Sequence, residues 1–326
     1  MWWWMLDAAA GTCASQQPTE PLATVSGAPF AEASGVAVSR TRDGVLFLHG
    51  DKGNDPVILA VDRQGNILDE HLVTDATNED WEDIAAAPCP DEGDCLYIGD
   101  IGDNDGTRPN VTVYVVREPA EGDDRIRSIR RYVAVYPEAP VDAETLMVHP
   151  CTGRIHVVTK ADDGISTIFR LPFDPEGTTT FEQVDKVAID APTLEGRQIT
   201  AGDWDPDGER VALRGSDRIF EWLTDPDQPN GHWNESPTVL VGTTEVQGEG
   251  LGYGLDGEIV TVGEGSPIPM SIARCDEVTP LQGTCEFPQT GRRCGCASGL
   301  EGSALGLPWV LGALALRRRR AVRSGR

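Results

Sequence analysis

Two neighbouring segments decide the fold: Asp80-Trp81-Glu82-Asp83-Ile84-Ala85 and Leu96-Tyr97-Ile98-Gly99-Asp100-Ile101-Gly102-Asp103-Asn104. Their apolar residues favour β-strands, and the residues between them, Pro88-Cys89-Pro90-Asp91-Glu92-Gly93-Asp94, favour a turn. The two segments therefore predict a β-hairpin. Because a hairpin reverses the chain, the acidic residues that begin the first strand and end the second lie at the same edge.

Weaker copies of this hairpin recur along the chain and set the architecture. Aligned on the apolar residue that opens each first strand, the copies are Ser34-Gly35-Val36, Glu82-Asp83-Ile84, Glu144-Thr145-Leu146, Gly202-Asp203-Trp204 and Glu249-Gly250-Leu251. Each copy is followed by a turn and a second strand, and most are followed by two further strands. Four-strand units with a period of about 50 residues predict an all-β fold, a β-propeller.

We expect five blades in this propeller. The last unit supplies only three strands, and the short β segment Leu22–Val25 supplies the fourth, so an N-terminal strand closes the ring and removes an exposed sheet edge. Six blades are the alternative, if Pro226–Glu235 or Cys275–Cys285 forms a degenerate blade. The predicted boundaries are an export-signal remnant and linker at 1–20, the propeller at 21–290 and a C-terminal sorting tail at 291–326.

The chain is strongly acidic. Its 326 residues contain 53 Asp and Glu against 27 Lys and Arg, a formal net charge of -26. Eight of the arginines lie from Arg292 onward, so the predicted propeller is more acidic still. Such a charge repels nucleic acid and anionic membranes, and we exclude both as partners of the folded domain. The alternative is that the charge is an adaptation for solubility or high salt.

Eight cysteines indicate an oxidising, secreted setting. Two local disulfides are predicted, one across the first turn and one at the end of the propeller: Cys89–Cys95 and Cys275–Cys285. Cys13 and Cys151 either pair with each other or remain a lipidation site and a free thiol. No cysteine pair or histidine cluster has the spacing of a zinc site.

The N-terminus resembles the back half of an export signal. An apolar start, Met1 to Leu6, is followed by small residues up to Cys13, but the usual basic segment is missing. A start site upstream of Met1 would explain this defect. Cys13 after small residues is a candidate lipidation site.

The C-terminus has three parts in order: Cys294-Gly295-Cys296, an apolar run from Leu305 to Leu316, and Arg317-Arg318-Arg319-Arg320. This order resembles the MYXO-CTERM sorting tail of myxobacterial surface proteins. The apolar run is shorter than the roughly 20 residues that span a bilayer. The resemblance implies export, processing near Cys294 and Cys296, and display at the cell surface or outer membrane, with membrane contact only through this tail.

The alternating strand directions of a blade bring acidic residues of several blades together. The starts of the innermost strands and the ends of the second strands lie on one face near the axis, the propeller mouth. The strand starts supply five candidate metal ligands: Glu82, Asp83, Glu144, Asp203 and Glu249. Converging carboxylates repel one another unless a cation is bound, and oxygen ligands without His or Cys suit Ca2+. The alternative is that some of these side chains point outward or pair with Lys160, Arg214 and Arg108.

The ends of the second strands, with the loop that follows one of them, supply a second set of charged residues. These candidate ligand-binding or anion-binding residues are Asp51, Asp100, Asp103, Lys160, Arg214 and Glu264. In one hypothesis calcium, Lys160 and Arg214 hold a phosphoester that a metal-bound water attacks. In the other, calcium ties the blades together and the face binds a partner. No Gly-x-Ser-x-Gly frame or histidine triad indicates nucleophilic catalysis, and no catalytic residue is assigned.

The acidic propeller resembles an uncharacterised group of secreted bacterial β-propeller proteins over roughly residues 20–285, and it resembles in kind the calcium-dependent propeller phytases and phytase-like esterases. The uncharacterised group supplies no activity. We favour a monomeric, surface-displayed, calcium-binding propeller that acts as a binding or scaffold module for a small anionic ligand, a glycan or a surface protein. The alternative is a phytase-like, calcium-dependent phosphoesterase with its site at the propeller mouth.

Overall fold

The computed structural model describes residues 11–13, 16–172, 175–224, 232–241, 245, 247–275 and 278–280. These residues belong to one compact unit, Met1–Gly295. Their regular secondary structure is almost entirely β-strand, and the one helix described is the four-residue α1 (Leu194–Arg197). Within these ranges, no helix is long and apolar enough to cross a membrane.

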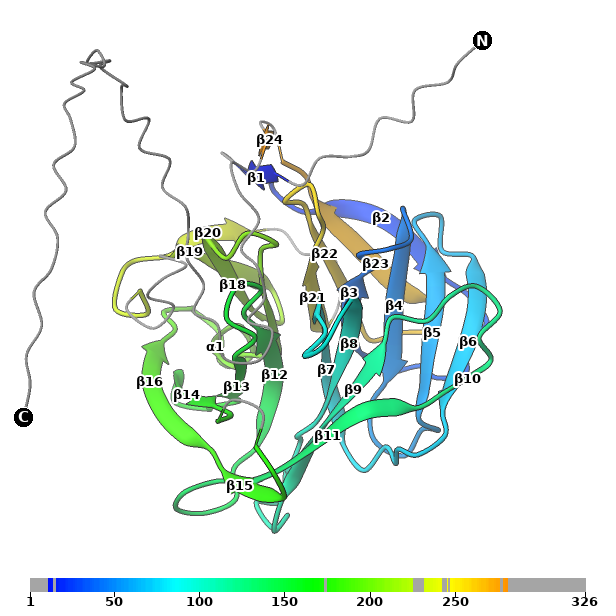
Figure 1. The fold of residues 1–326 in the computed structure, drawn as a ribbon. Helices are drawn as coiled ribbons and strands as arrows, with labels where there is room; N and C mark the ends of the chain where they lie inside the picture. Colours follow the sequence, from blue (N-terminus) through cyan, green and yellow to red (C-terminus); the bar gives the residue numbers. More distant parts are fainter. Residues whose placement is uncertain are drawn as a thin grey trace, which may run out of the picture. The chain divides into compact units, whose positions relative to one another are not determined.

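Five sheets, the blades, each contain four antiparallel strands that follow one another from the innermost strand outward (Figure 1). Blade 1 contains β3 (Ala33–Val38), β4 (Val45–Gly50), β5 (Val57–Asp62) and β6 (Ile67–Val73). Blade 2 contains β7 (Trp81–Pro88), β8 (Asp94–Asp100), β9 (Val111–Arg117) and β11 (Ser128–Val135). Blade 3 contains β12 (Ala143–Val148), β13 (Ile155–Thr159), β14 (Ile165–Arg170) and β16 (Glu182–Ala188). Blade 4 contains β17 (Ala201–Trp204), β18 (Arg210–Gly215), β19 (Arg218–Leu223) and β20 (Thr238–Val241). Blade 5 contains β21 (Gly248–Tyr253), β22 (Ile259–Gly263), β23 (Ile268–Ala273) and β2 (Glu20–Val25).

The innermost strands form a closed ring. β3 contacts β7, β7 contacts β12, β12 contacts β17, β17 contacts β21, and β21 contacts β3. All five segments of the sequence repeat fall on these strands, which confirms the five-bladed propeller. β2 pairs antiparallel with β23, from Glu20 opposite Ile272 to Val25 opposite Ile268. This pairing confirms that an N-terminal strand completes the last blade.

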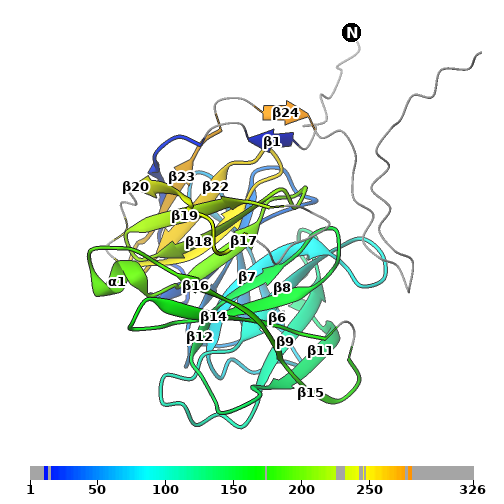
Figure 2. The same ribbon diagram turned by 90° about the vertical axis from the view of Figure 1, so that its left-hand side faces the viewer.

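Two short strands that the repeat did not predict connect neighbouring blades. β10 (Arg125–Ile126) leaves blade 2 and pairs parallel with β6 of blade 1. β15 (Thr178–Thr180) leaves blade 3 and pairs parallel with β11 of blade 2 (Figure 2). They cover outer edges that would otherwise expose unpaired backbone groups. A separate two-stranded sheet joins β1 (Gly11–Cys13) to β24 (Val278–Pro280).

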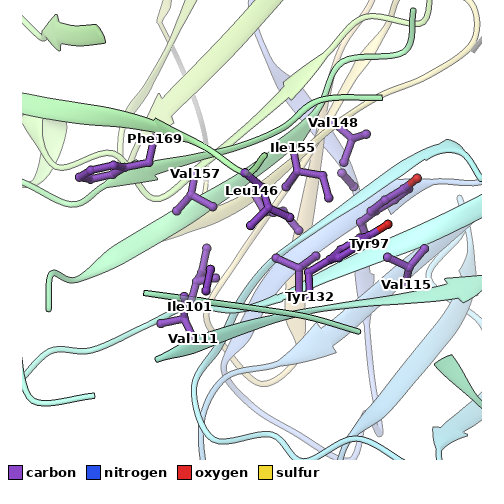
Figure 3. Close-up of a cluster of buried hydrophobic side chains, with 14 of the residues drawn as sticks. Tyr97, Ile101, Val111, Val115, Tyr132, Leu146, Val148, Ile155, Val157 and Phe169 are labelled. Carbon is purple, nitrogen blue, oxygen red and sulfur yellow. The ribbon is translucent and has the colours of Figure 1, made fainter. Parts of the chain in front are cut away.

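The hydrophobic core lies between adjacent blades. Between blades 2 and 3, Tyr97 of β8 and Val115 of β9 face Leu146 of β12 and Val157 of β13 (Figure 3). All four side chains are buried. At about 25 cal/mol per Å² of apolar surface removed from water, this packing is the main force that holds the blades together.

The cysteines follow the predictions in part. Cys89 and Cys95 form the predicted disulfide across the turn between β7 and β8, with their Cα atoms 5.0 Å apart. Cys151 and Cys275 also take part in disulfide bonds. The predicted partner Cys285 and the sorting-tail residues Cys294 and Cys296 lie outside the described residues, as does the apolar run with its arginine cluster.

Candidate functional site: carboxylate groups at the propeller mouth

Five carboxylates from three blades gather at the propeller mouth in two groups that share one residue. The first carboxylate group contains Asp51, Asp80 and Glu82, and the second contains Glu82, Asp142 and Glu144. Within each group, one carboxylate oxygen from every residue lies within 4.8 Å of the others. Asp51 directly follows β4, whereas Asp80 and Asp142 directly precede the innermost strands β7 and β12.

A β-bulge near the start of the innermost strand aims each glutamate at the mouth. The register of β7 against β8 shifts between Trp81 and Asp83, so Glu82 has no direct partner on β8. The register of β12 against β13 shifts in the same way around Glu144. A bulged residue leaves the alternation of the strand and turns its side chain in a new direction. The glutamates of two adjacent blades therefore converge.

The loop after β8 closes tightly over the first carboxylate group. The N–H groups of Ile101 and Gly102 donate to the Asp80 carbonyl at 3.1 and 3.2 Å. A Cβ atom at Gly102 would overlap Glu82 Oε1 and would lie 2.6 Å from Asp80 Cγ. A larger residue at this position would require both carboxylates to shift.

Three of the five carboxylates are buried, and burial raises their pKa values. The exposed fractions of Asp80, Glu82 and Glu144 are 6%, 7% and 4%. Burial, followed by the nearby Glu144 carboxylate, raises the pKa of Glu82 well above its ordinary value. Burial raises the pKa of Glu144 to about 8 and that of Asp80 to about 6, although a lysine opposes each shift. A cation bound beside these three carboxylates would stabilise their ionised forms.

Two buried oxygens of these groups have no hydrogen bond to the residues that the structure describes. Asp80 Oδ1 and Glu144 Oε2 are buried and have no hydrogen-bond partner among the described residues. A buried polar atom without a partner is costly. The two groups are thus arranged so that they could bind a metal ion, which would take up both oxygens.

A lysine lies near each of the two groups. Lys160 Nζ lies 2.5 Å from Glu144 Oε1, and the Lys160 side chain is 26% exposed. Lys52 Nζ lies 3.9 Å from Asp80 Oδ1, hydrogen-bonds to Asn104, and its side chain is 51% exposed. Lys160 is therefore paired with the second carboxylate group, whereas about half of the Lys52 side chain is exposed to solvent.

Three of the five predicted metal ligands lie outside both groups. Asp83 is fully buried, and its Oδ2 accepts the N–H groups of Leu146 and Gly202 from blades 3 and 4 at 3.0 and 3.4 Å. Asp203 Oδ2 accepts the Tyr253 N–H of blade 5 at 3.0 Å. These two carboxylates therefore connect innermost strands by accepting backbone N–H groups from neighbouring blades. Glu249 also stands apart from the two groups, near enough to Lys160 for each to influence the other's pKa.

Among the predicted anion-binding residues, only Asp51 belongs to a carboxylate group. Arg214 is fully buried, and its Nη1 donates to the carbonyls of Gly250 and Val262 at 2.9 and 3.0 Å. Asp100 pairs with Arg108 at 2.8 Å, and Glu264 accepts from a neighbouring side chain, Gln247.

Asp103 forms the turn after β8. Its two carboxylate oxygens each accept one backbone N–H, from Thr107 and Arg108, at 2.8 Å. These bonds hold the loop that covers the first carboxylate group. Asp103 itself belongs to neither group.

Asp80 and Asp142 are members of the groups that the sequence did not lead us to predict. Both stand two residues before the bulged glutamate of their blade, in Asp80-Trp81-Glu82 and Asp142-Ala143-Glu144. The Asp of this shared Asp-x-Glu pattern lies two residues upstream of the aligned segments of the repeat, and its Glu is their first residue. This pattern is the signal that could have found them.

Comparisons with known proteins add no assigned role. No family model matches the chain, and no curated protein matches its sequence. Among solved structures, the PQQ-bound aldose sugar dehydrogenase of Streptomyces coelicolor aligns with a TM-score of 0.47 and 10% identity, over 80% of this chain and 98% of that one. A gluconolactonase of Xanthomonas campestris, described as important in glucose secondary metabolic pathways, aligns with a TM-score of 0.46 and 10% identity, over 81% and 92%. At this identity, no residue's role transfers from either protein.

Proposed function

We propose that this chain binds a divalent cation, calcium, at the mouth of its propeller and that it acts as a binding module rather than as an enzyme. The observation that supports the proposal is the pair of carboxylate groups that share Glu82, with two buried oxygens left without hydrogen bonds among the described residues. Five carboxylates without His or Cys make a hard oxygen site. Calcium accepts several carboxylates in irregular geometry, whereas Mg2+ requires a near-octahedral one.

The positions of the two predicted anion-binding cations favour binding over phosphoester hydrolysis. Hydrolysis needs positive groups that face the substrate, and Arg214 and Lys160 were the residues predicted for that role. Arg214 is fully buried and donates to backbone carbonyls, so it presents no donor to a ligand at the mouth. Lys160 is paired with Glu144. A cation held at the mouth would instead offer its remaining positions to oxygen atoms of an anionic ligand, a glycan or a surface protein.

Thermal unfolding in calcium and in chelator tests this function. A ligand that binds only the folded state stabilises it by about 2.7 kcal/mol at a concentration 100-fold above Kd. For a domain of this size that gain corresponds to a rise in Tm of roughly 5–10 °C. We expect such a rise with Ca2+ and a smaller one with Mg2+.

A matched pair of variants tests whether the calcium-dependent rise in Tm comes from the mouth. Glu82→Gln should abolish the calcium-dependent rise in Tm, because Glu82 belongs to both groups. Glu70→Gln, at an exposed position on β6, should leave it unchanged. Equal Tm values in calcium and chelator for the unmodified protein would remove the proposed function.

A further inference from the structure

The two carboxylate groups differ in how far the protein itself already satisfies them. In the second group, Asp142 Oδ1 accepts the Asp103 N–H at 2.8 Å and Asp142 Oδ2 accepts the Asn104 amide at 3.2 Å. Glu144 Oε1 accepts the Lys160 ammonium at 2.5 Å. Of these four oxygens, only Glu144 Oε2 lacks a partner among the described residues.

The first carboxylate group differs because, within the described part of the chain, no ammonium hydrogen-bonds to it. Its Asp80 Oδ1 has no hydrogen bond within the described part of the chain, and the nearest ammonium, Lys52 Nζ, is 3.9 Å away. Lys52 is half exposed and makes its hydrogen bond to Asn104 instead. An ammonium that stays in water neutralises a buried carboxylate weakly, because solvent screens the interaction.

Lys160 lies among carboxylates, as a bound metal ion would. Three quarters of its side chain is buried, and the carboxylates that act on it come from more than one blade: Glu144, Glu249 and Asp142. The Lys160 ammonium lies 2.5 Å from Glu144 Oε1 and donates to it. The ammonium therefore carries its charge into the space where the second group would hold an ion.

We propose that Lys160 is the built-in cation of the second carboxylate group, so that the mouth takes one divalent ion, at Asp51, Asp80 and Glu82, and that removal of the lysine charge opens a second ion position at Glu82, Asp142 and Glu144. Glu82 would then bridge two ions, because it belongs to both groups. This inference rests on the proposed function and concerns the stoichiometry of the same site. It makes Lys160 the residue that sets the number of bound ions.

Calcium stoichiometry tests the inference, measured by isothermal titration calorimetry and checked by equilibrium dialysis with Ca2+ as the only added ion. The unmodified protein should bind one ion per chain, and Lys160→Met should bind two. Lys160→Arg keeps the charge and should bind one. Lys186→Met removes an exposed lysine on β16 of the same blade and should also bind one. If Lys160→Met fails to fold, Lys160→Gln retains a hydrogen-bond donor for Glu144 and should bind two.

The outcomes separate this inference from the proposed function. No binding by the unmodified protein would overturn both. One ion in the unmodified protein and one in folded Lys160→Met or Lys160→Gln would overturn the role of Lys160 and leave the calcium site standing. Two ions in the unmodified protein would also overturn the role of Lys160, because the lysine would then exclude nothing.

Discussion

Asp83→Ala should destabilise the propeller equally with and without calcium. Asp83 Oδ1 accepts the Ile84 N–H at 2.9 Å, and Oδ2 accepts the N–H groups of Leu146 and Gly202 at 3.0 and 3.4 Å. Through these bonds, one side chain joins the innermost strands of three blades. The innermost strands have no further strand on their axial side, so their axial N–H groups need another acceptor. Alanine would remove that acceptor from a fully buried position.

The geometry gives the size of the loss. A buried donor left without a partner costs about 1–3 kcal/mol. The bond to Gly202 is long and adds little, so the N–H groups of Ile84 and Leu146 dominate. They imply a loss of roughly 2–6 kcal/mol in the free energy of unfolding, out of a total of about 5–15 kcal/mol for a folded domain.

Urea unfolding followed by tryptophan fluorescence measures this loss, in excess calcium and again in excess chelator. Asp43→Ala, at an exposed turn, is the control and should change the free energy of unfolding little. A loss below about 1 kcal/mol for Asp83→Ala would refute the structural role, since ordinary surface substitutions cause changes of that size. A loss seen only in calcium would show that Asp83 is a cation ligand, as the sequence alone predicted.

Two further predictions concern the mouth and the blade contacts. Gly102→Ala should weaken calcium binding at least about tenfold, about 1.4 kcal/mol, because its Cβ would overlap Glu82 Oε1; an unchanged calorimetric titration would contradict this. Asp203→Asn should cost about 2–3 kcal/mol more stability at pH 5 than at pH 8. Burial raises the pKa of Asp203 from 3.8 to about 7, so its contribution is complete below pH 3.8 and is lost as pH rises through 7. Equal costs in urea unfolding at both pH values would contradict the prediction.

The architecture was predictable because its signals are local. Each blade is a series of hairpins. The apolar segments and turn residues that predict each hairpin lie within a few residues of its turn. Ring closure by β2 followed from the missing fourth strand of the last unit. The two crossing strands β10 and β15 were not predictable in this way, because they are two and three residues long and pair with strands of another blade.

The site was predictable only in part, because neighbouring acidic residues have opposite roles. Glu82 and Asp83 are adjacent, yet Glu82 lies at the mouth and Asp83 is fully buried with backbone partners of two other blades. A regular strand would place them on opposite faces, but the bulge around Glu82 changes that alternation. Nothing in the residue types of this segment marks the bulge, so the sequence alone could not divide the two roles.

The different surroundings of Arg214 and Lys160, both at the ends of second strands, could not be predicted from the sequence either. Both were placed at the mouth by the repeat, but Lys160 contacts the second carboxylate group, whereas Arg214 is fully buried and donates to backbone carbonyls. A Cβ atom at Gly248 would overlap Arg214 Nη2, so this glycine makes room for the guanidinium to lie inside the protein. Glu245 pairs with it at 3.6 Å, and both side chains are fully buried. The burial of Arg214 depends on Glu245 and Gly248, which are more than thirty positions away in the sequence. The local pattern around Arg214 does not contain this information.

The acidic residues near the axis therefore fall into two kinds: carboxylates that accept backbone N–H groups of other blades, and carboxylates that gather at the mouth. Where an innermost strand presents N–H groups toward the axis, a carboxylate that accepts them, such as Asp83 or Asp203, joins the blades without any ion. Where a bulge turns the side chain toward the mouth, as at Glu82 and Glu144, the carboxylate accepts from the Ser34 hydroxyl or the Lys160 ammonium, and a bound cation would stabilise its ionised form. In the proposal made above, the Lys160 ammonium is one such cation, and the Asp51, Asp80 and Glu82 group would take a cation from solution. A carboxylate near the axis of a propeller is thus a metal-ligand candidate only after its backbone donors have been counted.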